Sequence, residues 1–176
     1  MYASCSASNA APKLDKIAQL WYTYAMKLST KSTYGLRAML NIALNDDKKA
    51  VSITDIAKTE GISVAYLEQL LNRLRRKGLI KSIRGPKGGY ILADVPGKLT
   101  VGDIVVALEG DIVPVHCVGV EKLPKGVCKK TRDCVPKIVW LKLQKAINDC
   151  LNSITLKDLR DEAKKLGSCK EKKRGI

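Results

Sequence analysis

The chain has 176 residues, of which 45% are hydrophobic and 28% are charged. That balance is typical of a folded protein and excludes an intrinsically disordered one. Its 32 Lys and Arg against 17 Asp and Glu give a net charge of +15, so we expect a polyanionic partner, either nucleic acid or an anionic membrane surface. No apolar run approaches the roughly 20 residues of a membrane-spanning helix, which excludes an integral membrane protein. The single histidine, His116, excludes chemistry that needs a histidine pair in one chain.

The first 25 residues differ from the rest of the chain. They show no helical or strand period, and they lack the basic opening and unbroken apolar stretch of a secretion signal. We therefore expect residues 1–25 to be an N-terminal extension, either disordered or the product of an upstream start, with Met26 as the true start. We expect a cytoplasmic protein, and in that reducing compartment the six cysteines are not a disulfide framework.

Hydroxyl residues mark most of the helix starts. Ser52, Thr100 and Thr155 each stand three residues before an aspartate, which is the pattern of a capped helix N-terminus, and Ser63 caps in the same way without the acid. Together with the apolar spacing, these caps predict helices over about 30–45, 53–60, 64–77, 101–109, 135–153 and 156–166.

The helices over 53–60 and 64–77 are joined by a tight turn at Gly61, which predicts a helix-turn-helix over about 53–77. An alternating strand, a Gly-rich turn and a return strand follow over 79–92 and predict a β-hairpin, or wing. The predicted fold is mainly α with a small β-hairpin wing, in a DNA-binding domain over 26–110.

Basic residues without any acid fill the stretch from Gln69 to Ala93. They are Arg73, Arg75, Arg76, Lys77, Lys81, Arg84 and Lys87. At the start of the second helix, Ser63, Tyr66, Glu68 and Gln69 have the size and polarity to reach base edges in a major groove. We expect Arg73 and Arg76 to contact phosphates, and Arg84 and Lys87 at the wing to suit a narrow minor groove. An RNA-binding or membrane-surface role for the same stripe is the alternative.

Three separated motifs carry a resemblance. They are the stretch from Met26 to Met39, the stretch from Ile62 to Leu70, and Arg84-Gly-x-x-Gly-Gly-Tyr90. In this order they resemble the Rrf2 family of winged-helix regulators, which includes regulators of iron–sulfur biogenesis, nitric-oxide sensors and cysteine-metabolism repressors. The resemblance runs to about Leu166. It implies a homodimer on a pseudo-palindromic operator in double-stranded DNA, with Ser63, Tyr66, Glu68 and Gln69 in the major groove and Arg84 in the minor groove. Ala65 stands where a close relative has serine.

Cys117, Cys128 and Cys134 lie together in a predicted loop over 111–134 with ten and five residues between them. Three thiolates on one loop can hold an iron–sulfur cluster. Taken alone, the spacing also fits a zinc site completed by His116 or three incidental thiols. The remaining cysteines, Cys5, Cys150 and Cys169, are interpreted as structural or incidental.

The resemblance shifts this balance, because cluster-bearing members of the family hold a cluster with three cysteines at this place. It implies an iron–sulfur cluster, of the 2Fe–2S type, at Cys117, Cys128 and Cys134. Lys137 and Thr33 stand where two kinds of relative have their fourth ligand. That ligand is therefore open: His116, a group from the partner subunit or a small molecule.

A stripe of Trp140, Leu143, Ile147, Cys150 and Ile154 recurs every three or four residues, as in a coiled-coil seam. It lies outside the winged domain, so we expect residues 135–166 to hold the dimerisation helix and a final helix, followed by a basic tail over 167–176. No catalytic motif is present, so we do not expect an enzyme.

The sequence predicts a dimeric, sequence-specific transcriptional regulator that senses its signal through a cluster. Two alternatives stay open: a cofactor-free repressor of cysteine and sulfur metabolism that acts through a partner enzyme, and a zinc-bound RNA-binding module.

Overall fold

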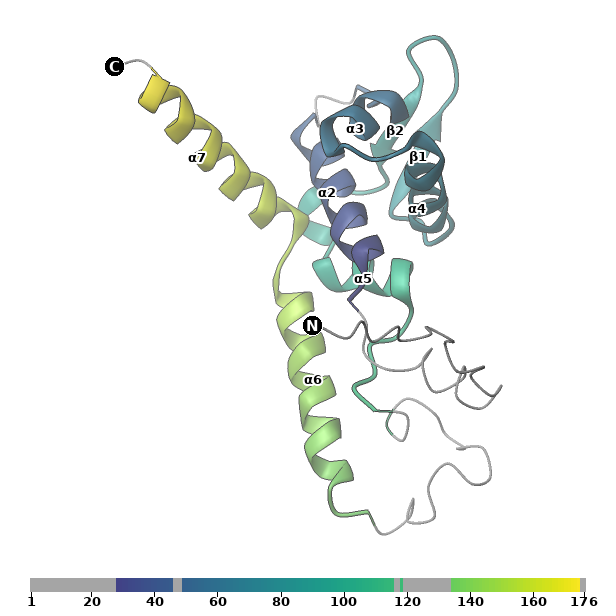
Figure 1. The fold of residues 1–176 in the computed structure, drawn as a ribbon, viewed down its shortest axis with the longest axis vertical. Helices are drawn as coiled ribbons and strands as arrows, with labels where there is room; N and C mark the ends of the chain where they lie inside the picture. The colour runs from purple at the N-terminus through teal and green to yellow at the C-terminus, as the bar shows by residue number, and fades with distance from the viewer. Residues whose placement is uncertain (1–27, 46–48, 116–117, 119–133, 175–176) are drawn as a thin grey trace, which may run out of the picture.

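The computed structural model describes residues 28–45, 49–115, 118 and 134–174, with side chains as far as Leu166. Figure 1 shows a compact winged body, with α6 and α7 projecting from it in different directions. The elements are α2 (Thr30–Leu44), α3 (Ile53–Glu60), α4 (Val64–Arg76), β1 (Ile80–Ile83), β2 (Gly89–Leu92), the 3-10 turn η1 (Pro96–Lys98), α5 (Val101–Glu109), α6 (Lys137–Ser153) and α7 (Leu156–Arg174). The predicted fold class, mainly helical with a two-stranded antiparallel wing, is confirmed.

The predicted helix caps are present. The Ser52 hydroxyl accepts a hydrogen bond from the Asp55 backbone N–H at 3.1 Å, and the Ser63 hydroxyl accepts one from that of Tyr66 at 3.2 Å. Thr100 and Asp103 form a reciprocal capping box at the start of α5. These bonds satisfy first-turn N–H groups that have no partner inside the helix, so each start lies within a residue of its predicted place.

Two features stabilise the turn between α3 and α4: the backbone conformation of Gly61 and an ion pair of Glu60. Gly61 adopts the left-handed conformation with φ 66°, which costs a glycine little. The carboxylate of Glu60, the last residue of α3, forms an ion pair with Arg37 of α2, and its side chain is only 8% exposed. The helix-turn-helix is thereby tied to α2 at the residue before its turn.

The core of the winged body is made mainly by one face of each of α2 to α5, with side chains from β1 and the start of α7. Its largest fully buried side chains are Met39, Ile56, Leu67, Leu70, Leu71, Leu74, Ile80, Ile104, Leu108 and Leu156. At Gly35 a Cβ would collide with Leu108, so the glycine permits the close approach of α2 to α5. Leu44, the last residue of α2, is 42% exposed.

The start of α7 packs into the winged body, although it lies outside the predicted domain over residues 26–110. The Leu156 backbone N–H donates to the Leu99 carbonyl at 2.8 Å, and that of Val101 donates to the Ile154 carbonyl at 2.9 Å. Leu156 itself is fully buried. The helix also continues through Arg174, so the predicted basic tail is helical from residue 167 to that point.

Because Leu156 fills the core from outside the predicted domain, Leu156→Ala should lower the free energy of unfolding by about 2–5 kcal/mol, the usual cost of a buried leucine. Denaturant unfolding measures this loss. Leu166→Ala is the matched control, since Leu166 lies on the same helix and is 60% exposed. Equal, small effects of the two substitutions would show that the start of α7 does not contribute to the winged core.

Candidate nucleic-acid interface

The two faces of α4 differ sharply. Leu67, Leu70, Leu71 and Leu74 are buried in the core. On the outer face, Glu68, Gln69, Arg75, Arg76 and Lys77 are exposed. The buried face fixes the helix in the body, so the outer face presents its polar and basic side chains to solvent in one orientation.

The first turn of α4 is organised around Tyr66. Its ring packs edge-on against the ring of Tyr34 with centroids 6.1 Å apart, and its hydroxyl lies 3.5 Å from the Thr30 hydroxyl of α2. The Ser63 hydroxyl is engaged as the helix cap. Two of the side chains that the sequence assigns to base contact therefore shape the helix start, while Glu68 and Gln69 remain exposed.

Arg73 has a structural bond that the sequence did not reveal. Its Nη1 group donates to the Leu108 carbonyl at 3.0 Å, near the end of α5. This bond satisfies a carbonyl that the last turn of a helix leaves unpaired and joins α4 to α5. Arg76, one turn further along α4, has no hydrogen-bond or ion-pair partner among the residues that the structure describes, and its charge is available to a phosphate.

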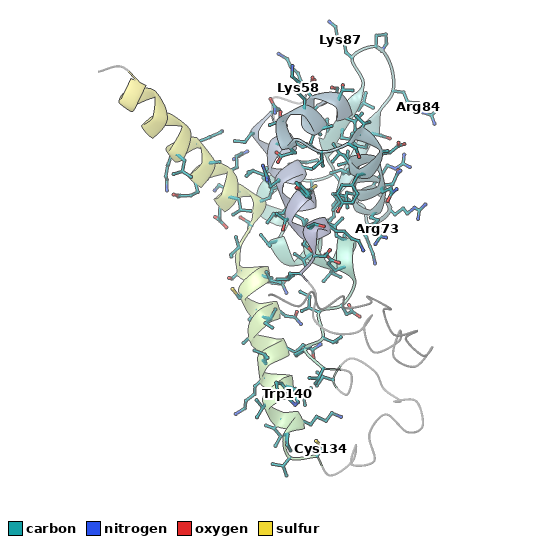
Figure 2. The ribbon with its side chains drawn as sticks, viewed as in Figure 1. Lys58, Arg73, Arg84, Lys87, Cys134 and Trp140 are labelled. Carbon is teal, nitrogen blue, oxygen red and sulfur yellow. The ribbon has the colours of Figure 1, made fainter. Side chains whose placement is uncertain are left out.

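Backbone hydrogen bonds fix the two strands of the wing to each other and to Val51. In the hairpin Ile80 is opposite Leu92, and Ile83 is opposite Gly89. Tyr90 and Val51 exchange backbone hydrogen bonds of 2.9 and 3.0 Å, and at Gly89 a Cβ would collide with the Val51 carbonyl. Arg84 and Lys87 are exposed, and Figure 2 shows both on the loop that extends beyond the strands.

A carboxylate from α5 caps the start of α2. Glu109 Oε1 accepts hydrogen bonds from the hydroxyls of Ser29 and Ser32, at 2.5 and 2.8 Å, and from the backbone N–H groups of the same two residues. Burial raises the pKa of Glu109, but the bonds from Ser29 and Ser32 outweigh burial, and its pKa lies below the ordinary value of 4.5. This cap joins residues 80 positions apart, so no local sequence pattern predicts it.

Glu109→Gln should lower the free energy of unfolding at neutral pH by about 1–2 kcal/mol, because a charged acceptor of several hydrogen bonds is lost. The folded-state pKa is depressed, so the stabilisation is complete above the ordinary pKa of 4.5 and is lost as the pH falls through the folded-state pKa. The difference between wild type and variant should therefore be constant near neutrality and shrink in acid.

Unfolding measured from pH 7 to pH 3 tests this, with the exposed Glu162→Gln as the control. A difference between Glu109→Gln and wild type that does not change over the whole range would contradict the proposed role of the ionised carboxylate.

The predicted metal ligands fall mostly outside the described residues: Cys117, Cys128 and His116 lie there. Cys134 is described; it is half-buried, and its carbonyl accepts a hydrogen bond from Lys137 N–H at 3.0 Å where α6 begins. Figure 2 places Cys134 beyond Trp140, at the end of α6 remote from the winged body. In the part of the chain that the structure describes, no three His, Cys, Asp or Glu side chains converge on a metal position.

The apolar stripe of α6 divides into two parts. Ile147 and Ile154, two residues of the predicted seam, are partly buried against Val101, Val105 and Ile112 of the same chain and attach the helix to the winged body. The first half of α6 is different, because it exposes Ile138, Val139, Trp140, Leu141 and Leu143.

Among the helices that the structure describes, none has both the length and the hydropathy of a transmembrane segment.

A family model described as "Rrf2: Iron-dependent Transcriptional regulator" matches residues 28–162. The chain belongs to the Rrf2 family. It is 39% identical over 134 residues to a curated protein of Klebsiella pneumoniae named HTH-type transcriptional regulator IscR, a match that covers 76% of this chain and 79% of the relative.

Solved structures of the Rrf2 family agree with this assignment. CymR of B. subtilis, described as a global cysteine regulator, is 40% identical, with a TM-score of 0.63 over 77% of this chain and 97% of CymR. IscR of T. potens is 42% identical, with a TM-score of 0.62 over 78% of this chain and 88% of its own. These proteins are winged-helix transcriptional regulators and not enzymes, so this chain is a DNA-binding transcriptional regulator.

Proposed function

We propose that the protein binds a pseudo-palindromic DNA operator as a homodimer, with α4 of each subunit in a major groove and the wing in the flanking minor groove. The observation that carries this proposal is the exposure of Arg76, Arg84 and Lys87, which lie in a stretch from Gln69 to Ala93 without Asp or Glu. The exposed polar pair Glu68 and Gln69 stands at its start, on α4. Phosphate recognition requires cations along the sides of the recognition helix, and base recognition requires polar side chains near its N-terminal end.

The dimer is proposed to form through the first half of α6. The five side chains exposed there have apolar surface that water disfavours, and a second copy of the same helix would bury it. Two winged bodies joined in this way present two recognition helices to successive turns of the duplex, about 34 Å apart. A regulator of this kind acts where the DNA is, so we place it in the cytoplasm.

We propose that Cys117, Cys128 and Cys134 hold an iron–sulfur cluster. Curated relatives carry the name IscR, and the described member of the set, Cys134, is half-buried beside the start of α6, where a helix favours negative charge. Thiolates are the usual ligands of such a cluster. Bound there, the cluster supplies a group that responds to oxidants and nitric oxide. His116, a partner-subunit group or a small molecule supplies the fourth ligand, and a 2Fe–2S cluster is the type we expect.

The second candidate is a repressor without a cofactor that acts through a partner enzyme. The similarity to CymR of B. subtilis favours it, since that structure fits the chain as well as the IscR structure does. The absorption spectrum of anaerobically purified protein distinguishes the two: visible bands indicate the cluster, and a colourless protein free of iron indicates the repressor.

Substitutions at base-contacting and phosphate-contacting residues should have different effects on DNA binding. Gln69→Ala should weaken binding to the cognate operator by about 1–3 kcal/mol and change binding to random DNA little. Arg76→Ala should weaken both and lower the slope of log K against log salt by about one for each phosphate contact removed. Fluorescence titrations at several salt concentrations measure these quantities.

Lys157→Ala is the control for Arg76→Ala, because Lys157 is an exposed cation on α7, outside the basic stripe. Equal losses on both DNAs for Gln69→Ala would exclude base readout by this residue.

Cys128→Ala should abolish the visible absorption, keep the dimer and change operator affinity. The dimer should persist because the exposed half of α6 lies outside the cysteine segment. Absorption, light scattering and operator titration are measured on the same anaerobic sample, with Cys150→Ala as the control, since Cys150 lies on α6 and is exposed. If Cys128→Ala bound the operator as wild type does, both in air and without oxygen, the cysteines would not be the sensor.

A further inference from the structure

The first turn of α4 has a chemical character that the polar contacts do not explain. Ser63 and Tyr66 are engaged within the protein, as helix cap and as a packing partner of Tyr34. Besides the cap residue Ser63, which is itself exposed, the exposed side chains of that turn are Val64, which is 41% exposed, and Ala65. The end of the helix that must enter a major groove therefore presents methyl groups.

These methyl groups are in register with the polar residues that follow. Val64 lies one turn before Glu68, and Ala65 lies one turn before Gln69, so each pair occupies one stripe of the exposed face. Glu68 and Gln69 have no side-chain hydrogen bond within the described part of the chain. The tip of α4 thus carries two methyl-bearing residues next to two free polar ones, on a helix whose opposite face is fixed in the core.

The major groove has one apolar group to match them, the C5-methyl of thymine, and alanine is among the residues that contact it. One helical turn advances 5.4 Å, which is between one and two base-pair steps of about 3.4 Å. When the Gln69 amide pairs with an adenine, the methyl of Ala65, one turn away, falls one or two base pairs from that adenine, and the methyls of Val64 lie beside it.

We propose that Val64 and Ala65 are specificity-determining residues that read thymine methyl groups beside the adenine bound by Gln69. The inference rests on the proposed DNA-binding function and goes beyond it, since it assigns apolar readout to two residues that would otherwise be spacers.

The test begins with duplexes selected from a random pool by the full-length protein. Each thymine of the selected site is then replaced by deoxyuracil, which removes only the methyl group. Replacement at one or two positions per half-site should weaken binding about fourfold each, which is the burial of one methyl at about 0.8 kcal/mol. Replacement elsewhere should have no effect.

Protein variants test whether Val64 and Ala65 are the residues that contact the methyl group. In the double variant Val64→Ser, Ala65→Ser, the thymine and uracil duplexes should bind equally, because the methyl contact is already lost. Val95→Ser is the matched control, since Val95 is 58% exposed outside α4, and it should keep the fourfold difference. Melting temperatures near that of wild type show that each variant is folded.

The outcomes separate the two claims. If no motif is enriched from the random pool, the proposed sequence-specific function fails, and this inference fails with it. If a motif is enriched but every uracil duplex binds as its thymine counterpart does, or if the double variant keeps the wild-type discrimination, the methyl readout is wrong while the DNA-binding function stands.

Discussion

The burial of the leucine face of α4 fixes the position of this helix in the winged body and the direction of its outer face. Four leucines of this helix are buried, and each contributes about 1.5–3 kcal/mol relative to an exposed position. Their packing leaves a single possible orientation for the outer face. The polar and basic side chains there need not stabilise the fold, and they are free to contact a partner.

The end of α5 is bonded to two other helices. The Leu108 carbonyl accepts the hydrogen bond of Arg73 from α4, and Glu109 caps the start of α2. Residue 110 then leads into the segment that carries the proposed ligands. The helix proposed to read DNA and the segment proposed to hold the cluster are thus both joined to α5.

Local chemistry was predictable from the sequence, and long-range packing was not. The starts of α3, α4 and α5 follow from Ser52, Ser63 and Thr100, because a cap involves residues only a few positions apart. The wing follows from its Gly-rich turn. The Glu109 cap and the bond from Arg73 to Leu108 join distant segments, and their residues resemble ordinary surface charges in the sequence.

The apolar stripe of α6 shows the same limit. Its spacing correctly predicted a helix, but spacing alone does not distinguish a residue that packs on its own chain from one that packs on a second copy. Ile147 packs inward only because Val101 and Val105 happen to face it, and that depends on the return of the chain at Leu156. The candidate base contacts differ for a similar reason. The Tyr66 ring packs against Tyr34, a residue of another helix, whereas the Gln69 side chain makes no hydrogen bond to the residues that the structure describes.

If the polar and basic face of each of two subunits binds DNA, the operator is contacted symmetrically, and a hydroxyl-radical footprint on the selected duplex measures this symmetry. We expect two protected regions related by a two-fold axis, with centres about one helical turn apart. We also expect weaker flanking protection that disappears when Arg84 and Lys87 are both replaced by glutamine. A single asymmetric footprint, or flanking protection unchanged in the Arg84→Gln, Lys87→Gln variant, would contradict these expectations.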